Sequence, residues 1–274
     1  MTRPRIGLPQ WQHPQWKRLG METLADYARY FNCVEGNTTL YALPRAEIVR
    51  RWHDMTDDEF RFCFKFPAAI SHQAALRNCQ KLLTAFFTLM APLEGRIGQY
   101  WLQMPAAFSP ADLPTLWDFL LLLPTGFSYG IEVRHPEFFA KGDAERQLNQ
   151  GLHQRGVNRV ILDTRAIHSA IPANPAIIEA QRKKPRLPVH ALMTADQPII
   201  RFIGGDDPLA NLDGFAAWLK KLPDWSQQGT PWLFIHTPDI ASAPALVQHL
   251  WPHLQRVLPA LGPMPDWPHQ VSLF

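Results

Sequence analysis

The sequence contains little cysteine: Cys33, Cys63 and Cys79 are the three cysteines among 274 residues. An odd number of cysteines, without the short spacing of metal ligands, indicates neither a disulfide framework nor a zinc site. Reduced thiols are the expected state, because disulfides persist mainly in oxidising compartments. We therefore expect a cytoplasmic protein whose core does not depend on cross-links.

The chain also lacks a long hydrophobic run. Its most apolar stretch, residues 116–123, is interrupted by Asp118. That stretch is far shorter than the roughly 20 apolar residues that a membrane-spanning helix requires. Residues 1–5 carry no apolar core of a signal peptide. The sequence therefore predicts neither membrane insertion nor secretion.

The sequence also has little excess of positive over negative charge. The formal net charge is +3, with 19% charged residues, which is too small an excess to indicate a nucleic-acid-binding protein by itself. A basic run at residues 182–186 follows a predicted helix. Cations suit the carboxyl end of a helix, and this run has no interleaved aromatic residues, so we interpret it as a solvated helix end.

What the sequence does contain is a regular alternation of short apolar runs and helical periodicity. The runs are rich in β-branched or aromatic residues and are bounded by Gly, Pro or Asn, as strands are. The predicted strands are residues 5–8, 33–37, 61–66, 99–104, 129–134, 159–163, 199–203 and 232–236. The predicted helices are residues 24–31, 46–55, 78–90, 113–123, 144–155, 175–184, 213–222 and 245–258. Thr23, Asp112, Asp143 and Asn174 lie near helix starts as candidate N-caps.

Eight strand–helix units in strict alternation predict a parallel sheet, and their number fits a closed (β/α)8 TIM barrel. A doubly wound open sheet is the alternative, but it usually carries a glycine-rich fingerprint after its first strand. Here residues 9–14 read Pro-Gln-Trp-Gln-His-Pro, without such glycines. We expect one barrel domain over residues 1–261 and a proline-rich tail over residues 262–274.

In a barrel, the active site is built at the carboxyl ends of the strands. Several predicted strands end in polar residues, although parallel strands buried on both faces should be apolar. The candidate catalytic residues are Glu35, Glu132 and Asp163. The candidate ligand-binding residues are Trp11, His13, Asn37, Tyr41, Lys65, His72, Gln103, Arg134, His135, Arg201 and His236.

A structural interpretation competes with the functional one. Buried polar groups cost several kcal/mol when they have no partner, so these residues must be paired. An ion-pair network that fills the barrel, joining Glu35 to Lys65 and Glu132 to Arg134, explains any single pair. For the whole set, the sequence favours a functional pocket for an anionic ligand.

Three blocks of the sequence resemble a known family. Residues 34–41 (Val-Glu-Gly-Asn-Thr-Thr-Leu-Tyr), 64–67 (Phe-Lys-Phe-Pro) and 132–136 (Glu-Val-Arg-His-Pro) are similar to the signature blocks of the YecE-like family. The resemblance covers nearly the whole chain and implies a TIM barrel, without implying a settled reaction. Family members typically begin Ile-Gly-x-x-Gly-Trp, whereas residues 6–11 here read Ile-Gly-Leu-Pro-Gln-Trp.

Three chemistries are open. Metal-assisted phosphodiester cleavage would use Glu35, His72, Glu132, Asp163 and His236, but cations would crowd such a metal site and no His-x-His pair occurs. A metal-free pocket, in which Lys, Arg and a carboxylate act together on a phosphate or carboxylate group, fits those cations better. Glycoside hydrolysis by Glu35 and Glu132 is the third option. A nuclease-like hydrolase is favoured over a glycosidase. No metal ligand set is assigned, and the cofactor is unknown.

The last residues suggest a partner. Residues 270–274 read Gln-Val-Ser-Leu-Phe and resemble the peptide by which bacterial replication and repair proteins bind the DNA sliding clamp. Gln270, Ser272, Leu273 and Phe274 match that peptide. Burial of the two apolar side chains contributes roughly 1.5–3 kcal/mol each, so hydrogen bonds must supply much of a micromolar affinity. The alternatives are a tail packed on its own domain and a small-molecule hydrolase or ligand-binding barrel without a role in DNA metabolism.

Overall fold

The computed structural model describes residues 2–267. Their contacts divide this part of the chain into two compact units, and each unit is described by itself. Unit 1 comprises residues 2–35, 163–186 and 200–267, and unit 2 comprises residues 36–162 and 187–199. Among the described residues, no helix combines the length and the apolar composition that crossing a membrane requires.

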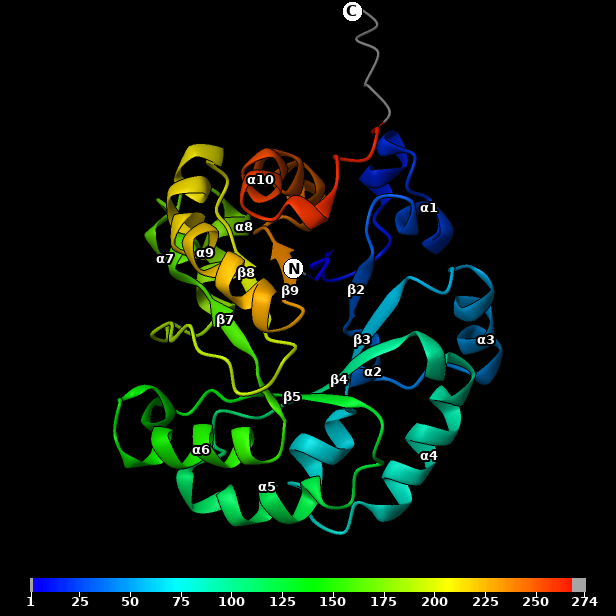
Figure 1. The fold of residues 1–274 in the computed structure, drawn as a ribbon, viewed down its shortest axis with the longest axis vertical. Helices are drawn as coiled ribbons and strands as arrows, with labels where there is room; N and C mark the ends of the chain where they lie inside the picture. The colour runs from blue at the N-terminus through cyan, green and yellow to red at the C-terminus, as the bar shows by residue number, and fades with distance from the viewer. Residues whose placement is uncertain (1, 268–274) are drawn as a thin grey trace, which may run out of the picture. The chain divides into compact units, whose positions relative to one another are not determined.

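Unit 1 contains strands β1 (Arg5–Gly7), β8 (Ile199–Ile203) and β9 (Trp232–His236). It also contains all but the last residue of β2 (Cys33–Gly36). Its helices are α1 (Leu24–Ala28), α7 (Arg165–Ser169), α8 (Pro175–Lys183), α9 (Pro208–Gln228) and α10 (Ala243–Val257). β1 pairs in parallel with β9, which places Ile6 beside Leu233. In Figure 1, α10 lies against α9 and β9, so that these helices cover the strands of the unit.

Unit 2 contains three consecutive parallel strands, β3 (Arg61–Lys65), β4 (Ile97–Gln103) and β5 (Ser128–Glu132). Its helices are α2 (Thr38–Tyr41), α3 (Ala46–Asp54), α4 (Gln80–Met90), α5 (Leu113–Leu120) and α6 (Asp143–Gln154). Two short strands, β6 (Asn158–Arg159) and β7 (Ile161–Asp163), follow α6. The strand orders are β1-β9-β8-β7 and β2-β3-β4-β5-β6.

The predicted strand–helix alternation is confirmed, and most strand bounds agree within two residues. The predicted strand over residues 159–163 is divided into β6 and β7. β6 pairs in parallel with β5, whereas β7 is the neighbour of β8 in the strand order. The ladder therefore changes partner within one continuous extended segment.

Aromatic packing fixes the strands of unit 2. Phe62 and Phe64 stack with ring centroids 5.2 Å apart, and Trp52 of α3 stacks on Phe64 at 5.5 Å. A Cβ atom on Gly36 would lie 2.2 Å from the Phe64 ring, so only glycine fits at that position. Rings of this size dominate the apolar area buried in a core. The position of the Lys65 end of β3 is therefore set by the rings that precede it.

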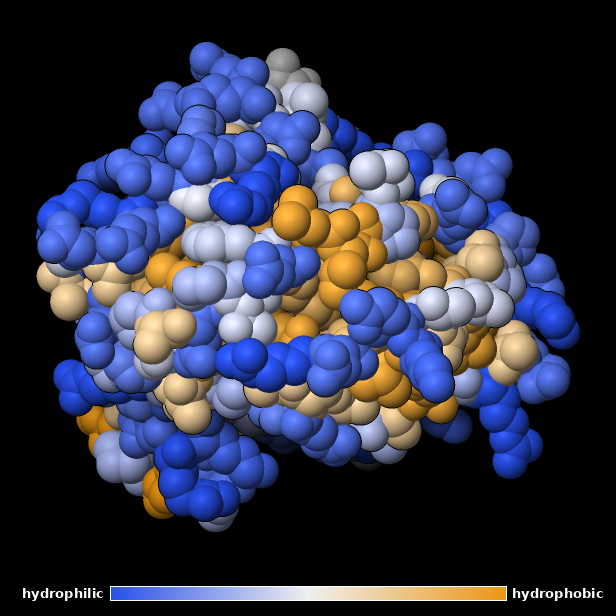
Figure 2. Space-filling view, turned by 90° about the horizontal axis from the view of Figure 1, so that it is seen from below, coloured by the Kyte–Doolittle hydropathy of each residue, from blue (hydrophilic) through white to orange (hydrophobic). Residues whose placement is uncertain are grey.

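Some hydrophobic residues remain on the surface. Figure 2 shows hydrophobic residues gathered in the middle of one face, with hydrophilic residues around them. In unit 2, the exposed leucines are Leu43, Leu82, Leu121 and Leu122. Single exposed aliphatic residues are common on folded proteins and do not by themselves indicate a binding site.

Candidate functional site

The first charged cluster is in unit 1 and joins side chains from three strands. Arg201 of β8 donates from Nη2 to Glu35 Oε1 (2.7 Å) and from Nε to Glu35 Oε2 (3.1 Å). His236, the last residue of β9, lies with Nε2 2.9 Å from Glu35 Oε2. The Glu35 side chain is fully buried, and those of Arg201 and His236 are nearly so. Three predicted site residues are thus brought together.

The described ion pair of Glu35 was not among the expected pairs. Arg201 is the described partner of Glu35. The expected pairing of Glu35 with Lys65 stays a prediction. The bidentate geometry, together with the additional histidine, satisfies a buried carboxylate well. The assignment of Glu35 as a catalytic residue, and of Arg201 and His236 as ligand-binding residues, stays a prediction.

The burial of His236 has a consequence for pH dependence. Burial lowers the pKa of His236 to about 4, and Glu35 opposes this shift only in part. In the unfolded chain the imidazole titrates near its ordinary value of 6.5. Below that pH the unfolded state binds a proton that the folded state does not bind, so the folded state loses stability as the pH falls from 6.5 towards 4.

We expect the replacement His236→Gln to flatten that pH dependence. In the wild-type protein, the His236 contribution to the free energy of unfolding should fall by about 1.4 kcal/mol per pH unit between pH 6.5 and 4. Urea unfolding at pH 7.0, 6.0 and 5.0 measures this slope in both proteins. Equal slopes in wild type and variant would show that another group governs the acid sensitivity.

Asp163, the third predicted catalytic residue, is held by two partners. Arg165 donates from Nε and Nη2 to its two carboxylate oxygens (3.0 and 2.8 Å), and Trp218 Nε1 donates to Oδ2 (2.7 Å). The Asp163 side chain is fully buried, and about half of the Arg165 side chain is exposed. The sequence did not predict the bond from Trp218 to Asp163. Helix periodicity indicates that Trp218 is buried, but not which group its indole N–H contacts. This arrangement favours a role in positioning Arg165.

The second charged cluster lies in unit 2, at the carboxyl ends of β3, β4 and β5. Lys65 Nζ donates to Gln103 Oε1 (2.8 Å) and lies 4.5 Å from the Trp101 ring centroid. Gln103 is the register partner of Glu132 on β5. Arg134 then donates from Nε and Nη2 to Glu132 Oε1 (3.1 and 2.9 Å), which confirms the expected pair of Glu132 with Arg134.

His72 belongs to this second cluster. It lies in a π-helical turn, Ala69–Gln73, that follows β3. Its Nδ1 is 2.8 Å from the hydroxyl of buried Ser71. Burial lowers the pKa of His72, and the charge of Arg134 lowers it further. Positive φ angles at Ala75 and Leu76 follow within a few residues, and such backbone strain is frequent near functional sites.

Exposure distinguishes the two clusters. The Glu132 side chain is buried, but a quarter of the Arg134 side chain is exposed. Both described bonds from Arg134 go to a single oxygen of Glu132, so the guanidinium has further donors to offer. The cluster in unit 2 therefore presents a partly accessible cation beside a buried carboxylate, a lysine and an imidazole.

The remaining predicted residues occupy less enclosed positions. His13 and His135 each cap a short 3-10 helix, and their Nδ1 atoms accept from the amides of Gln15 and Glu137. Tyr41 ends α2 and is 84% exposed. Trp11 follows β1 in unit 1, and Asn37 precedes α2 in unit 2. Among residues 2–267, no three His, Cys, Asp or Glu side chains are grouped as metal ligands.

The described part of the predicted tail packs on unit 1 through Trp267. Trp267 stacks on Tyr30 with centroids 4.6 Å apart and meets Phe31 edge-on at 5.7 Å. Trp267 is buried, and the two rings that it contacts follow α1 in the chain. The predicted partner-binding residues Gln270, Ser272, Leu273 and Phe274 lie outside the described residues.

Parallel strands alternating with helices, with charged clusters at the strand ends, define a mixed α/β protein. The chain belongs to the DUF72 family: the model described as "Protein of unknown function DUF72" matches residues 5–269. UPF0759 protein YecE of Escherichia coli strain K12 is 63% identical over 269 residues, which cover 98% of this chain and 99% of that protein. The protein of the same name from E. coli O157:H7 is equally similar.

Solved structures of the family share the fold. A DUF72 family protein from Enterococcus faecalis V583 superposes with a TM-score of 0.70 at 20% identity, covering 94% of this chain and 98% of that chain. A DUF72 family protein from Thermotoga maritima MSB8 gives a TM-score of 0.66 at 16% identity, covering 94% and 99%. At these identities the likeness concerns the fold.

Proposed function

We propose that unit 2 binds an anionic ligand, carrying a phosphate or carboxylate group, at the carboxyl ends of β3, β4 and β5. The observation that carries this proposal is the partly exposed guanidinium of Arg134, fixed on buried Glu132 and close enough to His72 to lower its pKa. Lys65 and Gln103 extend the cluster along the neighbouring strand ends. Cationic and amide donors of this kind recognise phosphate and carboxylate oxygens.

The same cluster carries groups for acid–base chemistry. Glu132 is the carboxylate nearest Arg134, and His72 is an imidazole whose Nδ1 is engaged by Ser71. Engagement of Nδ1 leaves Nε2 to face a ligand. We propose a hydrolase, with a phosphodiester or nucleic acid favoured over a glycoside as substrate, because the cations match a phosphate better than a neutral sugar. The alternative is a small-molecule hydrolase, or a ligand-binding protein, without a role in DNA metabolism.

Arg134→Met tests the anion site. A charged hydrogen bond is worth about 1.5–3 kcal/mol, so the dissociation constant for inorganic phosphate should rise about 10- to 100-fold. Chemical-shift titration of the folded variant measures it. Arg165→Met is the matched control, because Arg165 is also a partly exposed arginine bonded to a buried carboxylate, but in unit 1. Equal affinities of wild type and Arg134→Met would exclude the proposed site.

We also propose that the strands form one closed (β/α)8 barrel over residues 1–261. Closure requires β1 to lie beside β2 and β6 to lie beside β7. One observation at each of these places supports it. The Glu35 amide donates to the Leu8 carbonyl just beyond β1 (3.0 Å), and a Cβ on Gly7 would lie 2.2 Å from the Cys33 carbonyl, so β1 and β2 approach closely. β6 and β7 are separated by Val160 alone. An experimental structure with continuous β1–β2 pairing would meet this expectation, and one with an open edge there would refute it.

We further propose that Gln270, Ser272, Leu273 and Phe274 bind the DNA polymerase sliding clamp. The motif supports this, and the burial of Trp267 would fix the point from which the peptide starts. Anchoring of the preceding segment reduces the entropy that a peptide loses on binding. A cytoplasmic location accords with such a partner and with the three buried free thiols.

A further inference from the structure

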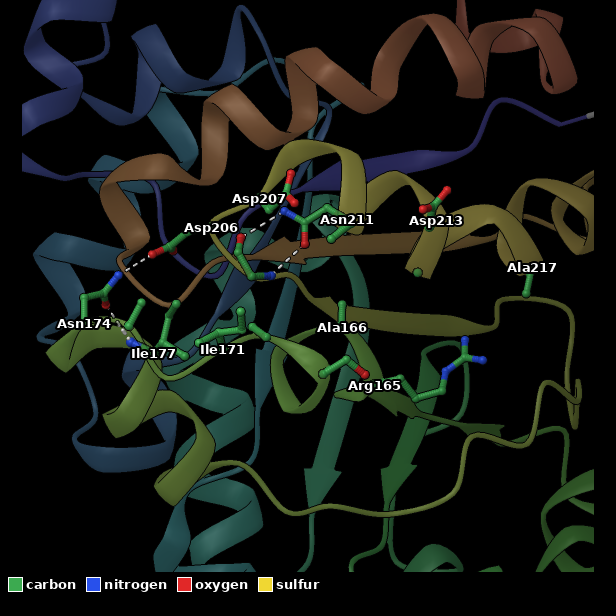
Figure 3. Close-up of a pocket in the computed structure, with 16 residues that line it drawn as sticks. Arg165, Ala166, Ile171, Asn174, Ile177, Asp206, Asp207, Asn211, Asp213 and Ala217 are labelled. Atoms are coloured by element: carbon green, nitrogen blue, oxygen red, sulfur yellow. Dashed lines mark hydrogen bonds between the residues drawn. The ribbon is translucent and has the colours of Figure 1, made fainter.

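A cavity lies in unit 1, formed by α7, α8 and the first half of α9 (Figure 3). Its volume is about 680 Å³. The facing side chains are small: Ala166 and Ala170 on one side, and Ala210, Gly214 and Ala217 on the other. Ala166 approaches Gly214 so closely that a Cβ on the glycine would lie 3.2 Å from the Ala166 Cβ. α7 and α9 therefore meet closely at Ala166 and Gly214, and the cavity beside this contact is lined by small residues.

One large aliphatic residue of the cavity lining is exposed, and two more are adjacent in sequence to lining residues. Ile171, which lines the cavity, is 80% exposed. Leu209, next to the lining residue Ala210, is 69% exposed, and Ile178, next to Ile177, is 52% exposed. Nine large hydrophobic residues are exposed among residues 2–267, and these are three of them. The exposed Ile171 therefore adds an apolar side chain to a cavity lined mainly by small residues.

Acidic side chains outnumber basic ones around this cavity. Asp206, Asp207 and Asp213 line the cavity, and Arg165 is the one cationic side chain among its described lining. Arg165 is held by the two carboxylate oxygens of Asp163, so its charge is already balanced. Asp206 accepts from Asn174 Nδ2 (2.5 Å), and Asp207 accepts from the Leu209 amide (2.9 Å), which fixes both residues at the start of α9. The net charge around the opening is negative.

We infer that this groove binds a segment of a partner protein, in which a bulky apolar residue is flanked by Lys or Arg. The apolar residue would enter the hollow between Ala170 and Ala210, and Ile171 would cover it. The basic residues would lie against Asp206 and Asp213. An apolar anchor in a preformed pocket, with complementary charge at the rim, is a common mode of peptide recognition. The partner class is therefore a basic amphipathic peptide.

Fluorescence anisotropy with two labelled model peptides tests the inference. One peptide of about 14 residues carries Leu at helical spacing with Lys elsewhere, and the other has Glu in place of every Lys. The Leu/Lys peptide should bind at least about 10-fold more tightly than the Leu/Glu peptide, since charge complementarity discriminates between partners. Equal binding of the two peptides, or no binding of either, would overturn the inference.

Two variants with matched controls locate the binding site. Ala210→Trp fills the hollow at an exposed helix position, and Ala245→Trp places the same side chain at an exposed position of α10. Asp213→Lys reverses a charge at the groove, and Asp224→Lys does so elsewhere on α9. Loss of Leu/Lys binding by about 10-fold or more is expected for the groove variants, and less than about 2-fold for the controls.

Other occupants give different results in the same experiments. Binding of n-hexylamine that Ala210→Trp abolishes, without binding of the Leu/Lys peptide, would overturn the inference in favour of a small-amine site. Concentration-dependent dimerisation that Ala210→Trp abolishes would overturn it in favour of a second copy of this chain. Circular dichroism of each variant establishes that a loss of binding is not a loss of the fold.

Discussion

Replacing Arg201 by methionine is expected to lower the free energy of unfolding by about 3–5 kcal/mol, because removal of one partner of a buried ion pair leaves an uncompensated charge. Arg201 supplies two hydrogen bonds to Glu35, whose side chain is fully buried. Methionine keeps much of the volume of the arginine stem, so a cavity contributes little to the loss. Urea unfolding at pH 7 measures the difference.

A double variant distinguishes the contribution of charge to the lost stability from the contribution of packing. Arg201→Met combined with Glu35→Gln removes both charges, and His236 keeps a polar neighbour at residue 35. Most of the lost stability should return, since replacing both members of a buried ion pair is often close to neutral. If the double variant is less stable than Arg201→Met alone, the cluster is held by packing and hydrogen bonds rather than by charge.

Removal of residues 269–274 is expected to abolish binding to the purified sliding clamp. The full-length protein should bind with a dissociation constant on the order of micromolar, and a form ending at Pro268 should show no measurable binding. Leu273 and Phe274 are the anchors of the proposed peptide, so their loss removes the groups that a hydrophobic groove would bury. Calorimetric titration measures the affinity of both forms.

The control for this experiment keeps the length of the tail. Leu273→Ser combined with Phe274→Ser leaves the backbone and Gln270 in place while removing the two apolar anchors. We expect this variant to behave as the truncated form does. Equal clamp affinity of the wild type and either altered form would remove the case for a replication partner and leave the tail without an assigned role.

The strands could be predicted from sequence because each is a short apolar run bounded by residues that end a strand. The bounds of β8 and β9 were predicted to the residue. Helix α9 shows where local signals fail: the predicted segment, residues 213–222, ends before Pro223, yet the helix runs from Pro208 to Gln228. Trp218, Leu222 and Trp225 on its buried face stabilise the continuation past the proline.

N-cap residues were predicted with mixed success. Thr23 and Asn174 cap α1 and α8 by accepting from backbone amides. Asp143 is instead the first residue of α6, after Gly142. Asp112 accepts from the Ser109 amide in a preceding 3-10 turn rather than capping α5 through its side chain. Both aspartates lie near helix starts, but sequence spacing does not decide which amide a short carboxylate reaches.

The sequence indicates which charged residues belong to the site. It indicates their ion-pair partners only where the two residues are close in sequence. Glu132 and Arg134 are two positions apart on one strand face, so their pair could be inferred. Glu35 and Arg201 are separated by 166 positions, and no local rule connects them. Ser71, which holds His72, and the cavity beside α9 also escaped prediction, because hydrogen-bond partners and hollows arise only when helices pack.

The pKa of the His72 imidazole, measured by NMR with and without inorganic phosphate, tests the central claim most directly. Without an anion, burial and the charge of Arg134 hold the pKa of His72 below its ordinary range. An anion bound at Arg134 would favour the protonated imidazole, so the account predicts a higher pKa in phosphate than in chloride, and no such rise in Arg134→Met. The same His72 pKa in phosphate and in chloride would contradict an anion site at the carboxyl ends of β3, β4 and β5.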